Sequence, residues 1–134
     1  MEIKQEQIQE KLMQFQTLQQ YIEQISEHLN LLQQQYQDLH DSKEALQEFS
    51  VTSKGKILAP IANGIFIKAE TADNQNLLVN VGADTVVKKS VPEVVKILSE
   101  RQKETVQKIN EAQQLLQEFH QQAAQIYREV EALE

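Results

Sequence analysis

The chain of 134 residues contains no cysteine and no tryptophan, and only three glycines and two prolines. The absence of cysteine excludes disulfides and thiol chemistry, and it fits a reducing compartment. Aromatic residues make up 5% of the chain, so little bulky material is available to fill a thick core. The composition favours elongated helices that each bury a narrow apolar stripe, within the length of one domain, residues 1–134.

Signals for membranes, export and nucleic acid are also lacking. No apolar run approaches the roughly 18 residues that a membrane span needs, and the first six residues lack the basic and apolar regions of a signal peptide. The net charge is −7 and no basic block occurs, which argues against nucleic acid as a partner. We therefore expect a soluble cytoplasmic protein that binds neither a membrane nor nucleic acid.

The residue groupings that catalysis needs are missing as well. His28, His40 and His120 flank the apolar stripes rather than cluster, and no ligand spacing typical of a metal site occurs. The hydroxyl groups lack a nearby His/Asp pair, and a coil of two helices offers no pocket for a substrate. We expect no catalytic residue, no metal and no cofactor; an enzyme would need a composite site between subunits.

Glutamine is abundant: 21 of the 22 glutamines lie in two long, glycine-free arms. In the first arm, residues 1–50, apolar residues alternate in steps of three and four, which is a heptad pattern. The expected a positions are Phe15, Ile22, Leu29, Tyr36 and Lys43, and the d positions are Leu18, Ile25, Leu32, Leu39 and Leu46. Lys43 interrupts the stripe near its end.

The repeat becomes ambiguous towards the N-terminus. Strict counting places Lys11 at d, whereas Leu12 is the apolar neighbour, so we expect a local shortening of the repeat there. Such a shortening would leave Ile3, Ile8 and Leu12 incompletely buried. The alternatives are a frayed helix end and an adhesive tip.

The second arm, residues 91–134, begins at Ser90-Val91-Pro92-Glu93, which has the spacing of a capping box. Its heptad repeat is unbroken. The a positions are Val95, Gln102, Ile109, Leu116, Ala123 and Val130, and the d positions are Val91, Leu98, Thr105, Ala112, Phe119, Ile126 and Leu133. The matched lengths predict an antiparallel coiled coil with Phe49 near Val91 and the polar Gln102 and Thr105 level with Lys43. A parallel coil between two chains is the alternative.

The middle segment, residues 56–89, predicts two β-hairpins. Asn63-Gly64 between two apolar runs indicates a turn with positive φ at both positions, and Pro60 indicates an edge or a bulge. Gly82-Ala83-Asp84 turns the second hairpin. Hairpins with free apolar edges favour assembly with other chains over a self-contained sheet covered by the helix bases. The expected assembly residues are Ile57, Leu58, Ile61, Ile65, Ile67, Leu77, Val79, Val81 and Val86.

Two arms around two hairpins resemble the alpha-class subunits of the prefoldin family, and the compact size resembles archaeal members. The runs Ile57 to Ala69 and Leu77 to Lys89 carry the resemblance, with Asp84 where the family often has a second glycine. The resemblance implies a mostly α, α+β fold in which the hairpins at the base of the coil join an oligomeric β-barrel. It also implies a hexamer of two alpha-class and four beta-class subunits.

Family members hold unfolded proteins between the coil tips without ATP and pass them to a cytosolic group II chaperonin. By this resemblance we expect a chaperone subunit whose client-contacting residues lie where both ends of the chain meet. These residues are Ile3, Ile8, Leu12, Ile126, Val130 and Leu133. Their ordinary packing in the coil is the simpler explanation, and a structural tether that docks through its β segment is the alternative function.

Overall fold

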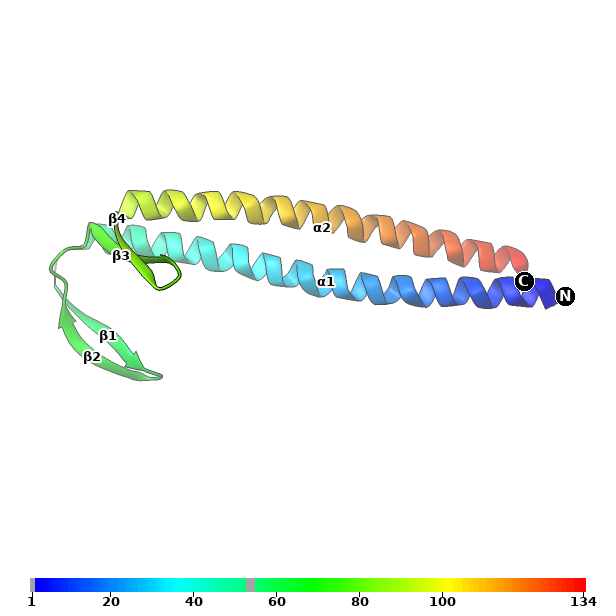
Figure 1. Cartoon of the computed structure of the whole chain (residues 1–134), viewed down its shortest axis with the longest axis horizontal. Helices are drawn as coiled ribbons and strands as arrows, with labels where there is room; N and C mark the ends of the chain where they lie inside the picture. The colour runs from blue at the N-terminus through cyan, green and yellow to red at the C-terminus, as the bar shows by residue number, and fades with distance from the viewer. Residues whose placement is uncertain (1, 53–54) are drawn as a thin grey trace. The chain divides into compact units, whose positions relative to one another are not determined.

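A computed structural model describes residues 2–52 and 55–134. The elements are α1 (Glu2–Val51), β1 (Lys56–Ala62), β2 (Ile65–Glu70), β3 (Asn76–Gly82), β4 (Thr85–Ser90) and α2 (Val91–Leu133) (Figure 1). The fold is mostly helical with two antiparallel hairpins, which confirms the predicted class. The chain forms two compact units: a terminal unit of residues 2–36 and 103–134, and a hairpin unit of residues 37–102.

In the terminal unit the helices α1 and α2 pack side by side and antiparallel, with the two chain ends together (Figure 1). Lys11 meets Glu129, and the ring of Tyr21 stacks on that of Phe119 with 5.7 Å between the ring centroids. The core contains Leu18, Ile22 and Ala123, and the half-buried residues packed against it are Phe15, Leu116, Phe119 and Ile126. These contacts confirm the predicted antiparallel coil within this unit.

The heptad positions of α2 are confirmed along its whole length, since every predicted a and d side chain is buried or half-buried. In α1 the predicted positions from Phe15 to Leu46 are covered likewise, except that Tyr36 is exposed. The predicted shortening near the N-terminus is wrong. Lys11 lies half-buried at its strict d position, while Leu12 is 47% exposed. The repeat continues because the aliphatic stem of a lysine can cover a seam while its amine reaches a polar partner.

The first hairpin of the hairpin unit pairs β1 with β2. Its register shifts between Pro60 and Ala62, which confirms the bulge expected where proline cannot donate to the ladder. The prediction of positive φ at both turn residues is wrong, because only Gly64 has it, at 78°. Glycine adopts the left-handed conformation more readily than asparagine, so a turn that needs positive φ only at its second central residue suits Asn63-Gly64.

The second hairpin pairs β3 with β4 and turns through left-handed residues that are not glycine. Ala83 has φ of 49° and Asp84 has φ of 59°, and Gly82 before them has 113°. Positive φ at both central residues matches the twist of the flanking strands, as in a type I′ turn. The side chain of Asn80 supports the turn by accepting a hydrogen bond from the Gly82 N–H at 2.9 Å.

The start of α2 is fully supplied with hydrogen-bond acceptors. The Glu93 N–H donates to Oγ of Ser90 at 3.3 Å, which confirms the predicted N-cap. The Val91 N–H donates to the Gln75 carbonyl at 2.9 Å, and Pro92 has no N–H to satisfy. Strand β4 therefore passes directly into the helix.

The loop between β2 and β3 caps the end of α1. Nδ2 of Asn74 donates to the carbonyls of Ser50 and Thr52 at 3.2 and 2.6 Å, and Nε2 of Gln75 donates to the Ser50 carbonyl at 2.8 Å. Carbonyls at a helix end need such partners because no later turn of the helix supplies an N–H. Helix α1 ends at Val51, one residue beyond the predicted end of the first arm at residue 50, and residues 53 and 54 lie outside the described residues.

A polar pair interrupts the seam between the helices in the hairpin unit. Nζ of Lys43 donates to Oε1 of Gln102 at 3.0 Å, and Gln102 is buried. The expectation that Lys43 and Gln102 lie level with each other is confirmed. A polar pair inside a seam specifies one alignment of the helices, because any other alignment leaves a buried polar group without a partner.

We expect Ala83→Asn with Asp84→Gly to stabilise the second hairpin by about 1 kcal/mol, because left-handed backbone is costly for alanine and favourable for Asn-Gly. The check is urea unfolding of the full chain. Gly64→Ala is the matched control in the first turn, and a loss of about 1 kcal/mol is expected there because φ is 78°. An unchanged urea midpoint in the Ala83→Asn, Asp84→Gly variant would show that the left-handed backbone at Ala83 does not destabilise the hairpin.

We expect Lys43→Ala to destabilise the hairpin unit by about 1–3 kcal/mol, since the buried amide oxygen of Gln102 loses its donor. The control is Lys43→Leu combined with Gln102→Leu, which removes both polar groups and is expected to recover the loss. Urea unfolding measures both variants. A single variant as stable as the double variant would show that the hydrogen bond has no part in the seam.

Candidate functional site

The six residues predicted at the coil tip differ in exposure. Ile3 and Leu12 are exposed; Ile8, Ile126 and Leu133 are half-buried; Val130 is buried. Val130 is thus part of the seam, and Ile126 packs against the core cluster. Ordinary coil packing therefore accounts for these two, whereas Ile3 and Leu12 remain available to a binding partner.

Two large exposed side chains near the same end of the coil were missed from the sequence. Met13 is 64% exposed and Tyr127 is 58% exposed, and neither lies at a predicted a or d position. A search for large apolar residues outside the stripe would have found them. Together with Ile3 and Leu12 they form an exposed apolar set, which we call the tip set.

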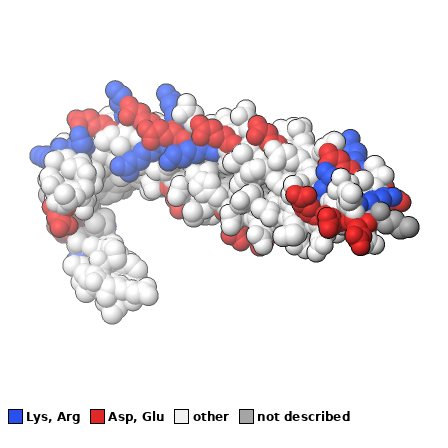
Figure 2. All heavy atoms as spheres, turned by 45° about the vertical axis from the view of Figure 1, so that its right-hand side comes forward, with Lys and Arg blue, Asp and Glu red and all other residues white. Residues whose placement is uncertain are grey.

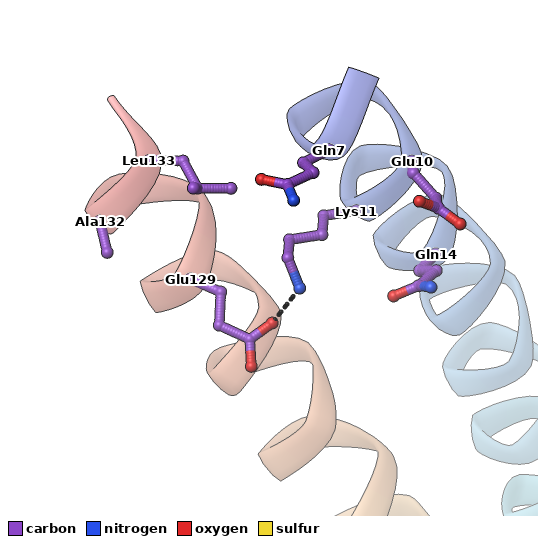
Figure 3. A pocket seen from close by; sticks show the side chains of 7 residues that line it. All are labelled: Gln7, Glu10, Lys11, Gln14, Glu129, Ala132 and Leu133. Carbon is purple, nitrogen blue, oxygen red and sulfur yellow. Dashed lines mark hydrogen bonds and ion pairs between the residues drawn. The ribbon is translucent and has the colours of Figure 1, made fainter. Parts of the chain in front are cut away.

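A groove of about 460 Å³ lies between the helices at this end (Figure 3). The residues that line it are Gln7, Glu10, Lys11, Gln14, Glu129, Ala132 and Leu133. Nζ of Lys11 donates to Oε2 of Glu129 at 2.5 Å across the groove, and Lys11 and Gln7 both point towards α2 (Figure 3). The ion pair bridges the helices where the seam contains a lysine instead of an apolar residue.

The ion pair holds the pKa of Glu129 below its ordinary value. The main cause is the hydrogen bond from Lys11, and a second hydrogen bond comes from Nε2 of Gln125 at 3.3 Å. Both donors stabilise the charged form of the carboxylate. Water reaches both members of the pair, so its attraction is screened.

A second groove, of about 500 Å³, adjoins the first through the shared residues Glu10 and Gln14. Met13, Leu18 and Ile126 give it an apolar lining, and the polar residues of its lining are Glu10, Gln14, Thr17 and Gln122. We call this the Met13 groove. An apolar surface edged with amides and one carboxylate can receive a side chain while contacting the backbone that carries it.

The two hairpins carry a second candidate surface. Seven of the nine predicted assembly residues are exposed, and the other two, Leu77 and Val79, are half-buried. Phe66 and Leu78, which were not predicted, are exposed too. Figure 2 shows the β1–β2 hairpin almost free of charged atoms on the face drawn.

Each sheet contains two strands, so its outer backbone groups lack a strand partner within the described residues. Isolated two-stranded hairpins are marginal in water. Exposed apolar strands with unpaired edges are the usual features of surfaces that pair with other strands.

Within the described residues, no group of histidine, cysteine or acidic residues could hold a metal ion, and no helix is apolar enough to cross a membrane. His40 lies 3.2 Å from a carboxylate oxygen of Glu44 on the same helix face. The loop residue Asp73 accepts hydrogen bonds from the Asn76 side chain and the Gln75 N–H, which lower its pKa.

The fold defines a two-helix coiled-coil protein with two β-hairpins between its helices. The family model described as "Prefoldin subunit" matches residues 18–134. The chain therefore belongs to the prefoldin subunit family, which is related to chaperones and whose members form oligomeric complexes.

Proteins named Prefoldin subunit alpha from several archaea are among the relatives of this chain. The protein of Pyrococcus horikoshii is 30% identical over 108 residues, which cover 81% of this chain and 72% of that one. The protein of Methanoculleus marisnigri is 27% identical over 124 residues, which cover 87% and 83%. The predicted resemblance to archaeal alpha-class subunits is thereby confirmed.

A solved structure supports the fold. A chain of the filamentous PFD from Methanocaldococcus jannaschii, determined by cryo-electron microscopy, superposes with a TM-score of 0.57. The alignment covers 93% of this chain and 96% of that one, at 17% identity.

The ion pair predicts a pH-dependent stability of the coil end. Because the pKa of Glu129 is lowered in the folded chain, its carboxylate stabilises the fold above its ordinary pKa and loses this effect as the pH falls through the lowered value. Thermal unfolding between about pH 6 and about pH 3 is the measurement. Glu129→Gln should lose less stability on acidification than the parent.

Lys11→Gln is the matched control for this experiment, because it keeps the carboxylate and removes its main partner. Its loss of thermal stability on acidification should be reduced to a similar extent. Equal losses of stability in the parent and both variants would show that the ion pair contributes nothing to folding.

Proposed function

We propose that this chain is an alpha-class prefoldin subunit that holds unfolded proteins at the ends of its coil. The observation that carries the proposal is the tip set: Ile3, Leu12, Met13 and Tyr127 are large apolar residues exposed near the chain ends. A group of exposed large apolar side chains offers a surface to a binding partner. The tip set is bordered by the other predicted client-contacting residues, which are the half-buried Ile8, Ile126 and Leu133 and the seam residue Val130.

The mode of binding that fits this surface is weak and multivalent. Covering one large apolar side chain contributes about 1.5–3 kcal/mol before the cost of ordering the client is subtracted. One coil end therefore binds loosely, and several ends in one complex bind strongly through their high effective concentration. Release then needs no ATP, because each contact opens separately.

Assembly is the proposed role of the segment 56–89. The residues Ile57, Leu58, Ile61, Ile65, Ile67, Leu77, Val79, Val81 and Val86 would join the hairpins of neighbouring subunits in a β-barrel. The partners are beta-class subunits, two alpha-class with four beta-class chains in a hexamer. The coil segments 1–50 and 91–134 then present their ends to a client, which is passed to a group II chaperonin in the cytoplasm.

The test separates assembly from client binding. Ile67→Asp places a charge on an exposed strand residue and should prevent assembly, measured as the mass of the complex formed alone and with a beta-class subunit. Lys68→Glu changes a neighbouring side chain that is already charged, and is the control.

The client arm of the test replaces three residues of the tip set together, Leu12→Ser, Met13→Ser and Tyr127→Ser. Suppression of the aggregation of an unfolded protein should fall by at least half, with the mass of the complex unchanged, and deletion of both coil ends should abolish it. Leu31→Ser with Val106→Ser, which changes exposed apolar residues outside the tip set, is the matched control. Full suppression after the deletion would overturn the proposal and favour a structural tether.

A further inference from the structure

Negative charge is concentrated in the terminal unit. Its segments, residues 2–36 and 103–134, contain eleven acidic and five basic side chains, whereas residues 37–102 contain nine acidic and eight basic ones. Nearly the whole net charge of −7 therefore lies on the unit that carries the tip set. Figure 2 shows acidic side chains near the chain ends, with basic side chains among them, and further charged side chains along the helices.

Glu10 brings this charge to the Met13 groove. It lines the groove with Met13 and also lines the adjoining one with Lys11. The amine of Lys11 is held by Glu129, and Glu10 points away from α2 (Figure 3). No cation of the described chain pairs with Glu10. A carboxylate beside an apolar lining is thus open to a positive charge from outside.

We infer that the Met13 groove selects unfolded segments in which an apolar side chain is flanked by lysine or arginine. The apolar side chain packs on Met13, Leu18 and Ile126, and the neighbouring cation reaches Glu10. The inference rests on the proposed function and adds a class of client to it. Complementary charge is what identifies the occupant: a terminal unit with net charge −6 attracts a cationic segment and repels an acidic one.

The expected size of the selection is modest. An exposed charge pair changes an affinity by about two- to fivefold and is screened by salt. Apolar contact therefore supplies most of the binding, and charge decides among clients of equal apolarity. A weak preference of this kind still allows the client to be released, whereas a strong ion pair between Glu10 and a client lysine or arginine would slow its release.

The test uses the full-length chain in the oligomer it forms and three unstructured, fluorescently labelled peptides. The peptides share one apolar centre, which is flanked on both sides by lysines, by serines or by glutamates. Fluorescence anisotropy at low and high salt measures the affinities. The lysine peptide should bind about two- to fivefold more tightly than the serine peptide, the glutamate peptide more weakly, and the differences should shrink at high salt.

Glu10→Lys should abolish or reverse this preference. Glu23→Lys is the matched control, because Glu23 is also exposed on α1 and lies about 20 Å along the helix, beyond the screening length of about 10 Å. Equal effects of the two variants would overturn the assignment to this groove. Met13→Ser should weaken all three peptides alike.

The outcomes distinguish this inference from the proposed function. If the three peptides bind equally while the chain still suppresses aggregation, the charge selection is wrong and the holding function stands. If no peptide binds and aggregation proceeds unchecked, the holding function fails and the inference fails with it.

Discussion

Leu18 and Ile22 of α1 pack against Ala123 of α2, and contacts of this kind along one seam keep both helices folded. The Gln-rich outer faces of the helices are exposed, so the seam is the main apolar surface that each helix buries. No described side chain is fully buried. The coil is therefore stabilised by many partial burials, each worth a small part of the roughly 1.5–3 kcal/mol of a fully buried large apolar side chain.

A seam of this kind tolerates polar residues only where each has a partner. Lys11 reaches Glu129 in the terminal unit, and Lys43 reaches Gln102 in the hairpin unit. Each pair replaces an apolar contact and lowers the stability that an apolar seam would have, because part of a charged or amide group is removed from water. In return, each pair favours one alignment of the helices.

The helical repeat of α2 was predictable because it never changes phase, and small or polar residues such as Ala112 and Gln102 occupy positions that the phase dictates. The prediction failed at Lys11, since counting apolar residues ignores the apolar stem of a lysine. The turn at Gly64 was misjudged because an Asn-Gly pair fits more than one turn type, and glycine alone can supply the positive φ.

Contacts between distant segments were harder to foresee. Capping of α1 by Asn74 and Gln75 depends on where the tertiary fold places a loop, and no local pattern encodes it. Met13 and Tyr127 were missed for a different reason: the heptad pattern identifies only the residues at a and d positions, and these two lie outside them. The proposed site thus depends most on the side chains that the coiled-coil pattern does not explain.

Ser90 has a mechanical consequence. It ends β4 and caps α2, so no linker separates strand from helix. With a flexible linker, a force on the helix would only rotate the linker bonds and would not reach the strand. Here the hydrogen bond from the Val91 N–H to the Gln75 carbonyl and the cap at Glu93 resist that rotation. The first turn of α2 and the β3–β4 hairpin should therefore move as one rigid unit, so that a torque on this turn is transmitted to the strands.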